Sequence, residues 1–342
     1  MQSAQSPAWS AKAVPNEIIV AVSPAGKSLR VLGSSGIVIG ASADAIVNAR
    51  FRAPIRESLS GYDAAEVFRG IIKSRLEDAL GREIAEVAPL GSTAGMNSRK
   101  EAQDARYASL GRRGADVLLD LVMTFGIYGS DGTLAIKLDG KLVAVPDGDT
   151  LWDNVLVVTN EPILANAKLG DPTKRMGMTL MNPEFAVDDE KMAQWTADGG
   201  AILRKRFEMA ANAAVGAMLC DLGLANDAAG EYALGKLAMN RKKFKLAAKH
   251  FENAMKLDPD LIDARNGYAV NMAHFGQVDD AIAVARSIAD SNSDYGPAWF
   301  NLAWWYATKK KDAAAAKSCY ENALALGMPK EGKIEKEIRK GG

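Results

Sequence analysis

A lysine–serine pair near the start of the chain is the pattern closest to a catalytic motif. The stretch Ala21–Ser28 has the sequence Ala-Val-Ser-Pro-Ala-Gly-Lys-Ser, a formal match to a relaxed phosphate-binding loop. It follows the apolar run Glu17–Val22, and Asp120 ends a second apolar run that could present an acidic side chain to magnesium. Together these features would describe a nucleotide-binding protein that uses Gly26-Lys27-Ser28.

The residues after this pair favour a turn instead. A phosphate loop needs backbone N–H groups around the phosphate and a helix that begins at the Lys-Ser pair. Residues 29–40 are instead rich in Val, Ile and Gly, which predicts strand and turn, and Pro24 removes one N–H from the loop. Asp120 lies between two leucines with no acidic neighbour. We therefore expect a turn between two strands, and nucleotide binding remains the less favoured alternative.

Other residues able to do chemistry are few. The chain has two histidines, His250 and His274, and two cysteines, Cys220 and Cys319, none at metal-ligand or Cys-x-x-Cys spacing. A histidine metal site or a catalytic triad is therefore not expected. Buried thiols are the expectation for the cysteines, while a disulfide between them stays open. We predict a non-enzymatic protein with no catalytic residues, no metal and no cofactor.

The net charge of the chain indicates no particular class of binding partner. The 42 basic residues balance the 42 acidic ones, so no global field favours nucleic acid or an anionic membrane. The basic run Arg241-Lys242-Lys243 is expected to form a solvated surface rather than a nucleic-acid patch. No stretch of 18 apolar residues is present, so no membrane-spanning helix is expected.

The first residues leave the compartment open. Met1–Ala13 is polar and small, with neither the basic region nor the apolar region of a signal peptide. A cytoplasmic N-terminus and a mature exported chain are both compatible with it. Membrane association is expected only if an anchor is missing from this sequence.

The last third of the chain repeats with a period of 34 residues. Leu234-Gly235, Tyr268-Ala269 and Leu302-Ala303 follow one another at this interval, and Pro259 lies where one repeat ends. Small residues at these points let two helices approach closely, while large ones fill the gaps between hairpins. The third repeat needs a slip of one residue through Lys309–Asp312.

This pattern resembles the tetratricopeptide repeat family, which implies three helical hairpins with a concave groove for a protein or peptide ligand. The last segment, Lys330–Lys340, suits a capping helix. Carrying the groove positions of the family onto this chain gives a mixed aromatic and amide surface on the first helix of each repeat. These positions are Tyr232, Lys236, Asn240, Asn266, Val270, His274, Phe300 and Trp304.

The preceding part of the chain predicts an α+β domain. Ala64–Leu80 has helical apolar spacing, and Ala115–Tyr128, Leu134–Val145 and Leu151–Val158 predict three consecutive antiparallel strands. The Asp139-Gly140 pair inside the second strand predicts a bulge or an extra tight turn. Further elements are expected as strands at 17–22, 29–31, 37–40 and 84–87, and as helices at 188–194 and 201–222.

A second resemblance concerns residues 17–225. Gly114–Asp120, the strand after it, Leu151-Trp152, and Trp195 followed by Asp198–Ala201 resemble bacterial envelope lipoproteins that include domains of the curli-export-channel type. The resemblance implies a place in the periplasm or cell envelope and self-association of this domain. The chain lacks the lipidated N-terminal cysteine and the long membrane hairpins of that family, so the resemblance does not extend to anchoring or to a pore.

Together these observations predict an α+β domain with an antiparallel sheet packed by helices, followed by an all-α superhelical array. The expected boundaries are a disordered lead-in at 1–16, the α+β domain at 17–226, three repeats at 227–328 and a capping helix at 329–342. The expected function is an adaptor of the bacterial cell envelope that recruits a partner through the groove. A subunit of an oligomeric secretion or outer-membrane-associated ring is the alternative, and a cytoplasmic location is the alternative to the envelope.

Overall fold

The computed structural model describes residues 18–24, 30–32, 57–81, 84, 86–89, 117–128, 133–144, 148–170 and 189–341. The lead-in at 1–16, the Gly26-Lys27-Ser28 loop and the strand expected at 37–40 lie outside these ranges. The chain divides into two compact units. The first comprises Met1–Asn160 and Pro172–Asn226, and the second comprises Glu161–Asp171 and Asp227–Gly342. The segment Glu161–Asp171 thus packs with the second unit, whereas the boundaries expected from the sequence include it in the domain at 17–226.

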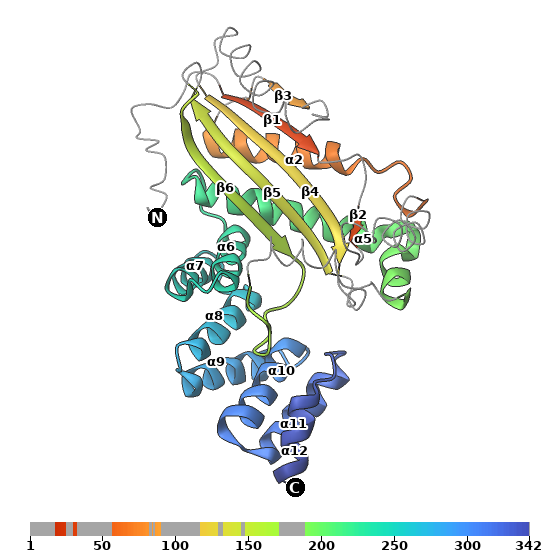
Figure 1. Ribbon diagram of the computed structural model, residues 1–342, viewed down its shortest axis with the longest axis vertical. Helices are drawn as coiled ribbons and strands as arrows, with labels where there is room; N and C mark the ends of the chain where they lie inside the picture. The colour runs from red at the N-terminus through yellow and green to blue at the C-terminus, as the bar shows by residue number, and fades with distance from the viewer. Residues whose placement is uncertain are drawn as a thin grey trace, which may run out of the picture. The chain divides into compact units, whose positions relative to one another are not determined.

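The first unit contains a mixed sheet with strand order β3-β1-β4-β5-β6 (Figure 1). Its strands are β1 (Ile18–Pro24), β2 (Arg30–Leu32), β3 (Glu86–Pro89), β4 (Val117–Tyr128), β5 (Thr133–Ala144) and β6 (Thr150–Thr159). Strands β4, β5 and β6 form the predicted antiparallel meander, which is confirmed. Strand β1 runs parallel to both β3 and β4, and β2 runs parallel to β4.

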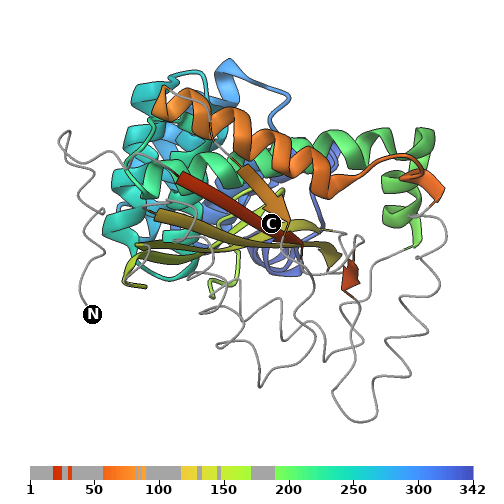
Figure 2. The same ribbon diagram turned by 90° about the horizontal axis from the view of Figure 1, so that it is seen from above.

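Two helices, α2 (Ala64–Leu80) and α5 (Asp189–Asp221), pack against each other on one face of the sheet, as both views show (Figures 1 and 2). Helix α2 has the predicted bounds and is followed by Gly81, whose positive φ of 64° suits a glycine. Helix α5 is broken at Ala197–Gly200, where the backbone leaves the helical region. The break accounts for the two separate helices that the sequence predicts.

Gly140 makes room for a tryptophan, which corrects the prediction of a bulge or turn at Asp139-Gly140. Strands β4 and β5 pair without interruption through Leu121 and Gly140. A Cβ at Gly140 would lie 2.5 Å from the ring of Trp152, and the indole N–H of Trp152 donates to Asp221 at 2.8 Å. The glycine therefore serves the packing of Trp152, and the irregularity of the meander lies elsewhere, between β5 and β6 at Leu142/Val143.

The second unit is an array of helical hairpins. Its helices are α6 (Ala228–Asn240), α7 (Phe244–Leu257), α8 (Ile262–His274), α9 (Val278–Ser291), α10 (Gly296–Trp305), the π-helical turn η2 (Tyr306–Lys310), α11 (Ala313–Ala325) and α12 (Gly332–Gly341). The first helices of the three hairpins begin 34 residues apart, at Ala228, Ile262 and Gly296, as the sequence period predicts. Helix α12 follows the third hairpin and buries Ile334.

The packing inside a hairpin follows the alternation of small and large residues. A Cβ at Gly235 would lie 2.7 Å from the ring of Phe251, so the glycine lets α6 approach α7 closely. The predicted slip in the third repeat is visible as η2, whose wider π-helical turn adds one residue. As a result α11 begins 35 residues after α9, while α9 begins 34 residues after α7.

Candidate functional site

The most elaborate set of polar contacts in the array surrounds a segment of its own unit. Residues 161–166, here called the groove segment, contact α6, α8 and α10, the first helices of the three hairpins. In Figure 1 this part of the chain is the yellow-green loop that passes α8 and reaches α10. It has no helix or strand structure, and its Ile163 is 3% exposed within the apolar cluster of the array.

Two buried asparagines bind the backbone of the groove segment. The Nδ2 of Asn266 donates to the carbonyl oxygen of Ile163 at 2.9 Å, and the Nδ2 of Asn301 donates to the same oxygen at 3.2 Å. The Oδ1 of Asn301 accepts the backbone N–H of Ala165 at 2.7 Å. A further bond of 2.8 Å from Asn301 to the Oδ1 of Asn266 fixes the orientation of both amides. Both side chains are 0% exposed, so these bonds form away from water, where an unpaired amide would be costly.

Polar contacts also hold the two ends of the groove segment. The Lys236 ammonium donates to the carbonyl oxygen of Glu161. At the other end, the Nδ2 of Asn166 donates to the carboxylate of Glu331 at 2.6 Å, just before α12 begins. Six residues therefore span all three hairpins and reach the capping helix.

The side chain of Ile163 occupies a site whose floor is a glycine. A Cβ at Gly267 would lie 2.8 Å from the Cδ1 of Ile163 and 2.8 Å from the Cε1 of Phe251. The absence of a side chain at Gly267 therefore makes space for both Ile163 and Phe251. An aliphatic side chain that is nearly fully buried contributes about 1.5–3 kcal/mol relative to an exposed one.

The structure brings only part of the predicted site to the groove segment. Lys236 and Asn266 contact it directly. Val270 and Phe300 are 1% and 0% exposed and belong to the apolar cluster together with Ile163, so with the segment in place neither offers a surface to a further ligand. In this structure residues 161–166 of the chain occupy the part of the groove that Lys236 and Asn266 line, and the binding of a partner by the eight predicted residues stays a prediction.

The other four predicted residues have their own neighbours. Tyr232 packs beside Phe251, and burial followed by the charge of Asp263 raises the pKa of its hydroxyl. Trp304 lies under the ammonium of Lys333, which is 4.9 Å from the ring centroid.

His274 is exposed and stacks on Phe244, with ring centroids 4.9 Å apart. Partial desolvation, followed by the charge of Lys309, lowers its pKa. Asn240 is half-buried at the end of α6.

Sequence reasoning missed Asn301 and the groove segment itself. The residue 34 positions after Asn266 is Phe300, so a strict period selects Phe300 and passes over its neighbour Asn301. The two residues point about 100° apart around the helix, which is why one lies in the apolar cluster and the other reaches the segment. Residues 161–166 carry no helical or strand period, so only their contacts reveal them.

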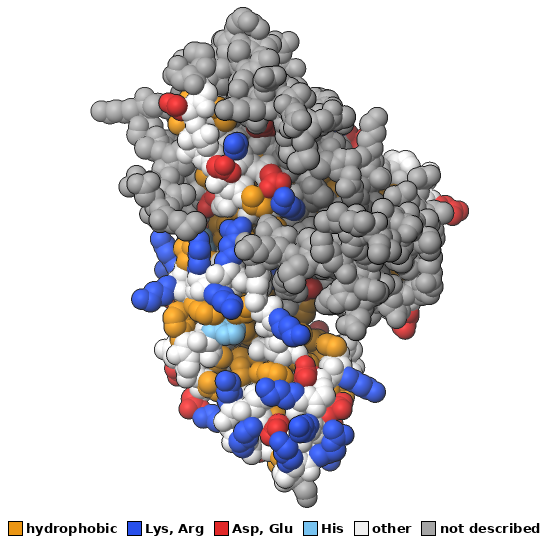
Figure 3. Space-filling model, viewed as in Figure 1, with side chains coloured by type: hydrophobic (Ala, Val, Ile, Leu, Met, Phe, Trp, Pro, Cys, Tyr) orange, Lys and Arg blue, Asp and Glu red, His pale blue; other side chains and the backbone are white. Residues whose placement is uncertain are grey.

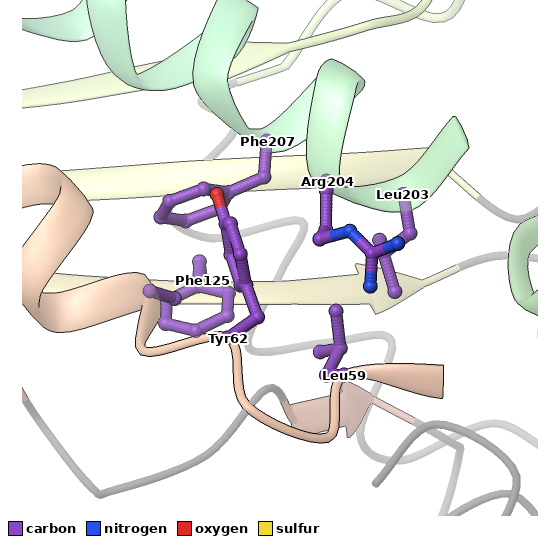
Figure 4. A pocket seen from close by; sticks show the side chains of 7 residues that line it. Leu59, Tyr62, Phe125, Leu203, Arg204 and Phe207 are labelled. Atoms are coloured by element: carbon purple, nitrogen blue, oxygen red, sulfur yellow. The ribbon is translucent and has the colours of Figure 1, made fainter. Parts of the chain in front are cut away.

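A small recess in the first unit does not qualify as a ligand site. Figure 4 shows its lining, in which Tyr62, Phe125 and Phe207 face one another and Arg204 closes one side. The guanidinium of Arg204 is already bound to the carbonyl oxygen of Ser58 at 2.9 Å. The recess has room for little more than one water molecule.

The remaining chemistry of the described residues is sparse. Cys220 and Cys319 are both free thiols, and burial raises the pKa of Cys319 although Arg286 opposes this. Among the described residues no group of three or more His, Cys, Asp or Glu side chains could hold a metal ion. Residues 30–32, soon after the Lys-Ser pair, form strand β2, where a phosphate loop would need a helix.

The described helices and the surface add two observations. None of these helices combines the length and apolar character needed to cross a membrane. On the face shown in Figure 3, Lys and Arg side chains are scattered over the array among acidic and apolar ones.

A protein-family model supports the prediction that the array consists of tetratricopeptide repeats. The tetratricopeptide repeat family model matches residues 238–303, which extend from α6 into α10. Among solved structures the chain is similar to YrrB, which is described as a TPR protein with an unusual peptide-binding site. The two sequences are 18% identical, the match covers 43% of this chain and 74% of that chain, and the TM-score is 0.31. No curated protein matches the chain in sequence. The resemblance of residues 17–225 to curli-export-channel domains finds no support in these comparisons.

Proposed function

We propose that the protein is a non-enzymatic adaptor that recruits a protein partner by binding a non-helical segment of it in the groove of the tetratricopeptide repeats. The observation that carries this proposal is the pair Asn266 and Asn301, whose buried amides bind the backbone of a non-helical segment that ends in a turn at Leu164–Ala167. Backbone hydrogen bonds provide affinity for an extended chain, and a side-chain pocket provides selectivity. The site at Gly267 that accepts Ile163 supplies such a pocket.

The repeat architecture supports the same function. Stacked hairpins form one continuous surface, in which the first helix of every hairpin can contact the same ligand. Here α6, α8 and α10 each contribute one polar side chain to the same six residues. A ligand that contacts all three hairpins gains several weak contacts at once, while each hairpin alone would contribute little.

The proposal is tested by affinity capture with the full chain as bait and an extract of native cells. The matched bait carries Asn266→Ala and Asn301→Ala, which remove the backbone contacts and leave the outer surface unchanged. We expect a partner that the native chain retains and the double variant loses. Equal retention of every protein by both baits would show that the groove does not recruit.

The proposed place of action is the bacterial cell envelope. The support is the resemblance of residues 17–225 to envelope lipoprotein domains, which also suggests a subunit of an oligomeric ring as the second candidate. Fractionation of native cells should place the protein with periplasmic or membrane fractions, and recovery in the cytoplasm would contradict this. Mass photometry separates the candidates, because a monomer at micromolar concentration would count against a ring.

A further inference from the structure

The groove segment uses the polar groups that a partner would need. The Oδ1 of Asn301 accepts the N–H of Ala165, and its Nδ2 donates both to Ile163 and to Asn266. The Nδ2 of Asn266 is also bound to the Ile163 carbonyl. A second peptide chain cannot form these bonds while the segment is in place.

We infer that the groove segment is a built-in competitor, and that the partner that displaces it is a non-helical peptide of the same chemistry, which turns as the segment does at Leu164–Ala167. This peptide presents a branched aliphatic side chain at the Ile163 position, a free backbone N–H two residues later, and a hydrogen-bond donor on the next side chain. The inference rests on the proposed function and adds to it the class of ligand and the contact that regulates its access.

The aliphatic requirement follows from the site of Ile163. Its floor is Gly267, and the ring of Phe251 lies against the same glycine in the apolar cluster that contains Ile163. Ile163 lies within the buried apolar cluster of the array, so a polar side chain in its place would lose its hydration there. Branched aliphatic residues of similar volume fit best, because packed sites tolerate volume-conserving exchanges.

The polar requirements follow from Ala165 and Asn166, the last two residues of the groove segment. The N–H of Ala165 is bound by Asn301, so a proline at that position would leave the Asn301 oxygen unpaired in a buried site. Glu331 accepts a bond from Asn166, which calls for an amide or an ammonium group on the partner. An acidic side chain there would face the Glu331 carboxylate and be repelled.

The segment is suited to release because it contributes no helix to the array. The helix pairs of the three hairpins pack on each other directly, and the segment adds only its side chains and backbone bonds. Pro162 within the segment is exposed, and so are Ala167 and Lys168, which follow it. Because the segment belongs to the same chain, its effective concentration is of millimolar order, which weakens apparent binding of any free peptide.

The test uses the full chain and a fluorescein-labelled peptide with the sequence of residues 160–170, Asn-Glu-Pro-Ile-Leu-Ala-Asn-Ala-Lys-Leu-Gly. Fluorescence anisotropy measures its Kd for the native chain, for Ala165→Pro, and for the control Lys168→Ala, which changes an exposed residue of the same region. Ala165→Pro removes the N–H that Asn301 binds and so releases the segment without altering the groove. We expect Ala165→Pro to bind at least roughly tenfold more tightly than the native chain and the control.

Two further variants make the result specific. Adding Asn301→Ala to Ala165→Pro should abolish the gain, because the groove then lacks its central amide. Ile163→Ser should release the segment by a different route and reproduce the gain, which guards against a local folding defect caused by proline. Helical circular dichroism of each variant verifies that the array is folded.

Two outcomes would overturn the inference. Equal affinity of the native chain and both release variants would show that the segment does not compete, although groove binding itself would stand. Absence of peptide binding in every folded variant would show that the groove does not accept this chemistry from outside. The proposed function is decided separately by the capture experiment, whose partner is not assumed to resemble residues 160–170.

Discussion

At the scale of single residues, the array depends on amides that are buried and fully engaged. Asn266 and Asn301 bind each other and make three hydrogen bonds to two backbone groups of the groove segment, without exposure to water. Exposed ion pairs such as Lys340 with Glu337 contribute little by comparison, because water screens them. The free energy of the groove contact is therefore concentrated in a few uncharged side chains.

Replacing Asn301 by alanine should destabilise the array by about 1–3 kcal/mol, because the buried N–H of Ala165 and the Oδ1 of Asn266 both lose a partner. Urea unfolding followed by far-ultraviolet circular dichroism measures the change. Asn322→Ala, at an exposed position of α11, is the control and should change stability by no more than about 0.5 kcal/mol. Equal effects of the two substitutions would contradict the role given to Asn301.

A second residue-scale effect concerns two tyrosines near Asp263. The hydroxyl of Tyr295 donates to Asp263 at 2.6 Å, and burial followed by this carboxylate raises its pKa well above the usual value near 10. Burial and Asp263 raise the pKa of Tyr232 as well. Above pH 10 the unfolded chain loses these protons while the folded chain keeps them, so stability is full below pH 10 and falls as pH rises above it.

Tyr295→Phe should therefore make the alkaline loss less steep. Each tyrosine that keeps its proton only in the folded state lowers the free energy of unfolding by roughly 1.4 kcal/mol per pH unit above pH 10. The variant lacks the Tyr295 hydroxyl and so loses one of these two contributions. The variant should be less stable than the native chain near pH 8, since it lacks the bond to Asp263, but its unfolding free energy should fall more slowly above pH 10. Parallel pH profiles of the two proteins in urea unfolding would refute the assignment.

At the scale of elements, the turns between the helices of a hairpin share one conformation. Lys242, Gly276 and Lys311 all have positive φ, at 59°, 84° and 59°, and each lies between the two helices of its repeat. Only the second repeat uses glycine, the residue that adopts this conformation without strain. The left-handed conformation costs an ordinary residue about 1–2 kcal/mol.

Lys242→Gly should therefore stabilise the array by about 0.5–1 kcal/mol, because relief of strain exceeds the greater freedom that glycine gains on unfolding. Lys249→Gly, at an exposed position within α7, is the matched control and should destabilise by about 1 kcal/mol. Thermal unfolding of both variants gives the comparison. A loss of stability in both would show that the turn carries no strain.

Gly267→Ala should destabilise the array by about 1–3 kcal/mol even though alanine favours a helix, because its Cβ would press on Ile163 and Phe251 at 2.8 Å. Gly332→Ala is the control, since nothing lies within 4 Å of a Cβ there. It should leave stability unchanged or raise it slightly. Hydrogen exchange should also show faster exchange of the Ala165 N–H in Gly267→Ala, and unchanged exchange there would contradict the proposed site for Ile163.

The sequence predicts these elements well where a period governs them. The 34-residue spacing gives the hairpins, and the slip near Lys309 appears as a π-helical turn. Helix α2 and the meander follow from apolar spacing in the same way. The prediction of a bulge or turn at Gly140 was wrong. In sequence, a glycine that makes room for the ring of Trp152 cannot be told from a glycine that a bulge requires. This packing depends on Trp152 of the neighbouring strand β6, and the sequence pattern around Gly140 does not include that residue.

At the scale of the whole molecule, the two units are not consecutive in the chain. The second unit takes Glu161–Asp171 from between the parts of the first and then resumes at Asp227. A boundary at residue 226 is natural by sequence, yet it would separate the array from the residues that fill its groove. Domain limits read from composition miss this, because irregular residues gain their place only through tertiary contacts.

A fragment of residues 227–342 should therefore be less stable than the array in the full chain and should be rescued by a peptide. Its melting temperature should rise with the concentration of the peptide 160–170, since a ligand that binds only the folded state stabilises it by mass action. The same peptide with Ile163→Ser should have a much smaller effect. Equal shifts with both peptides would show that the Ile163 pocket does not recognise its side chain.

The distant origin of the groove segment also sets an order of events during synthesis. Helices within a hairpin close short loops, whereas the bonds from Ile163 to Asn266 and Asn301 span 103 and 138 residues. Contacts of long sequence separation form late, because a large loop must close first. The segment leaves the ribosome before any hairpin exists and must wait for α10 before all its bonds can form. Each newly made molecule thus passes through an interval with a folded but empty groove, in which a partner meets no competitor.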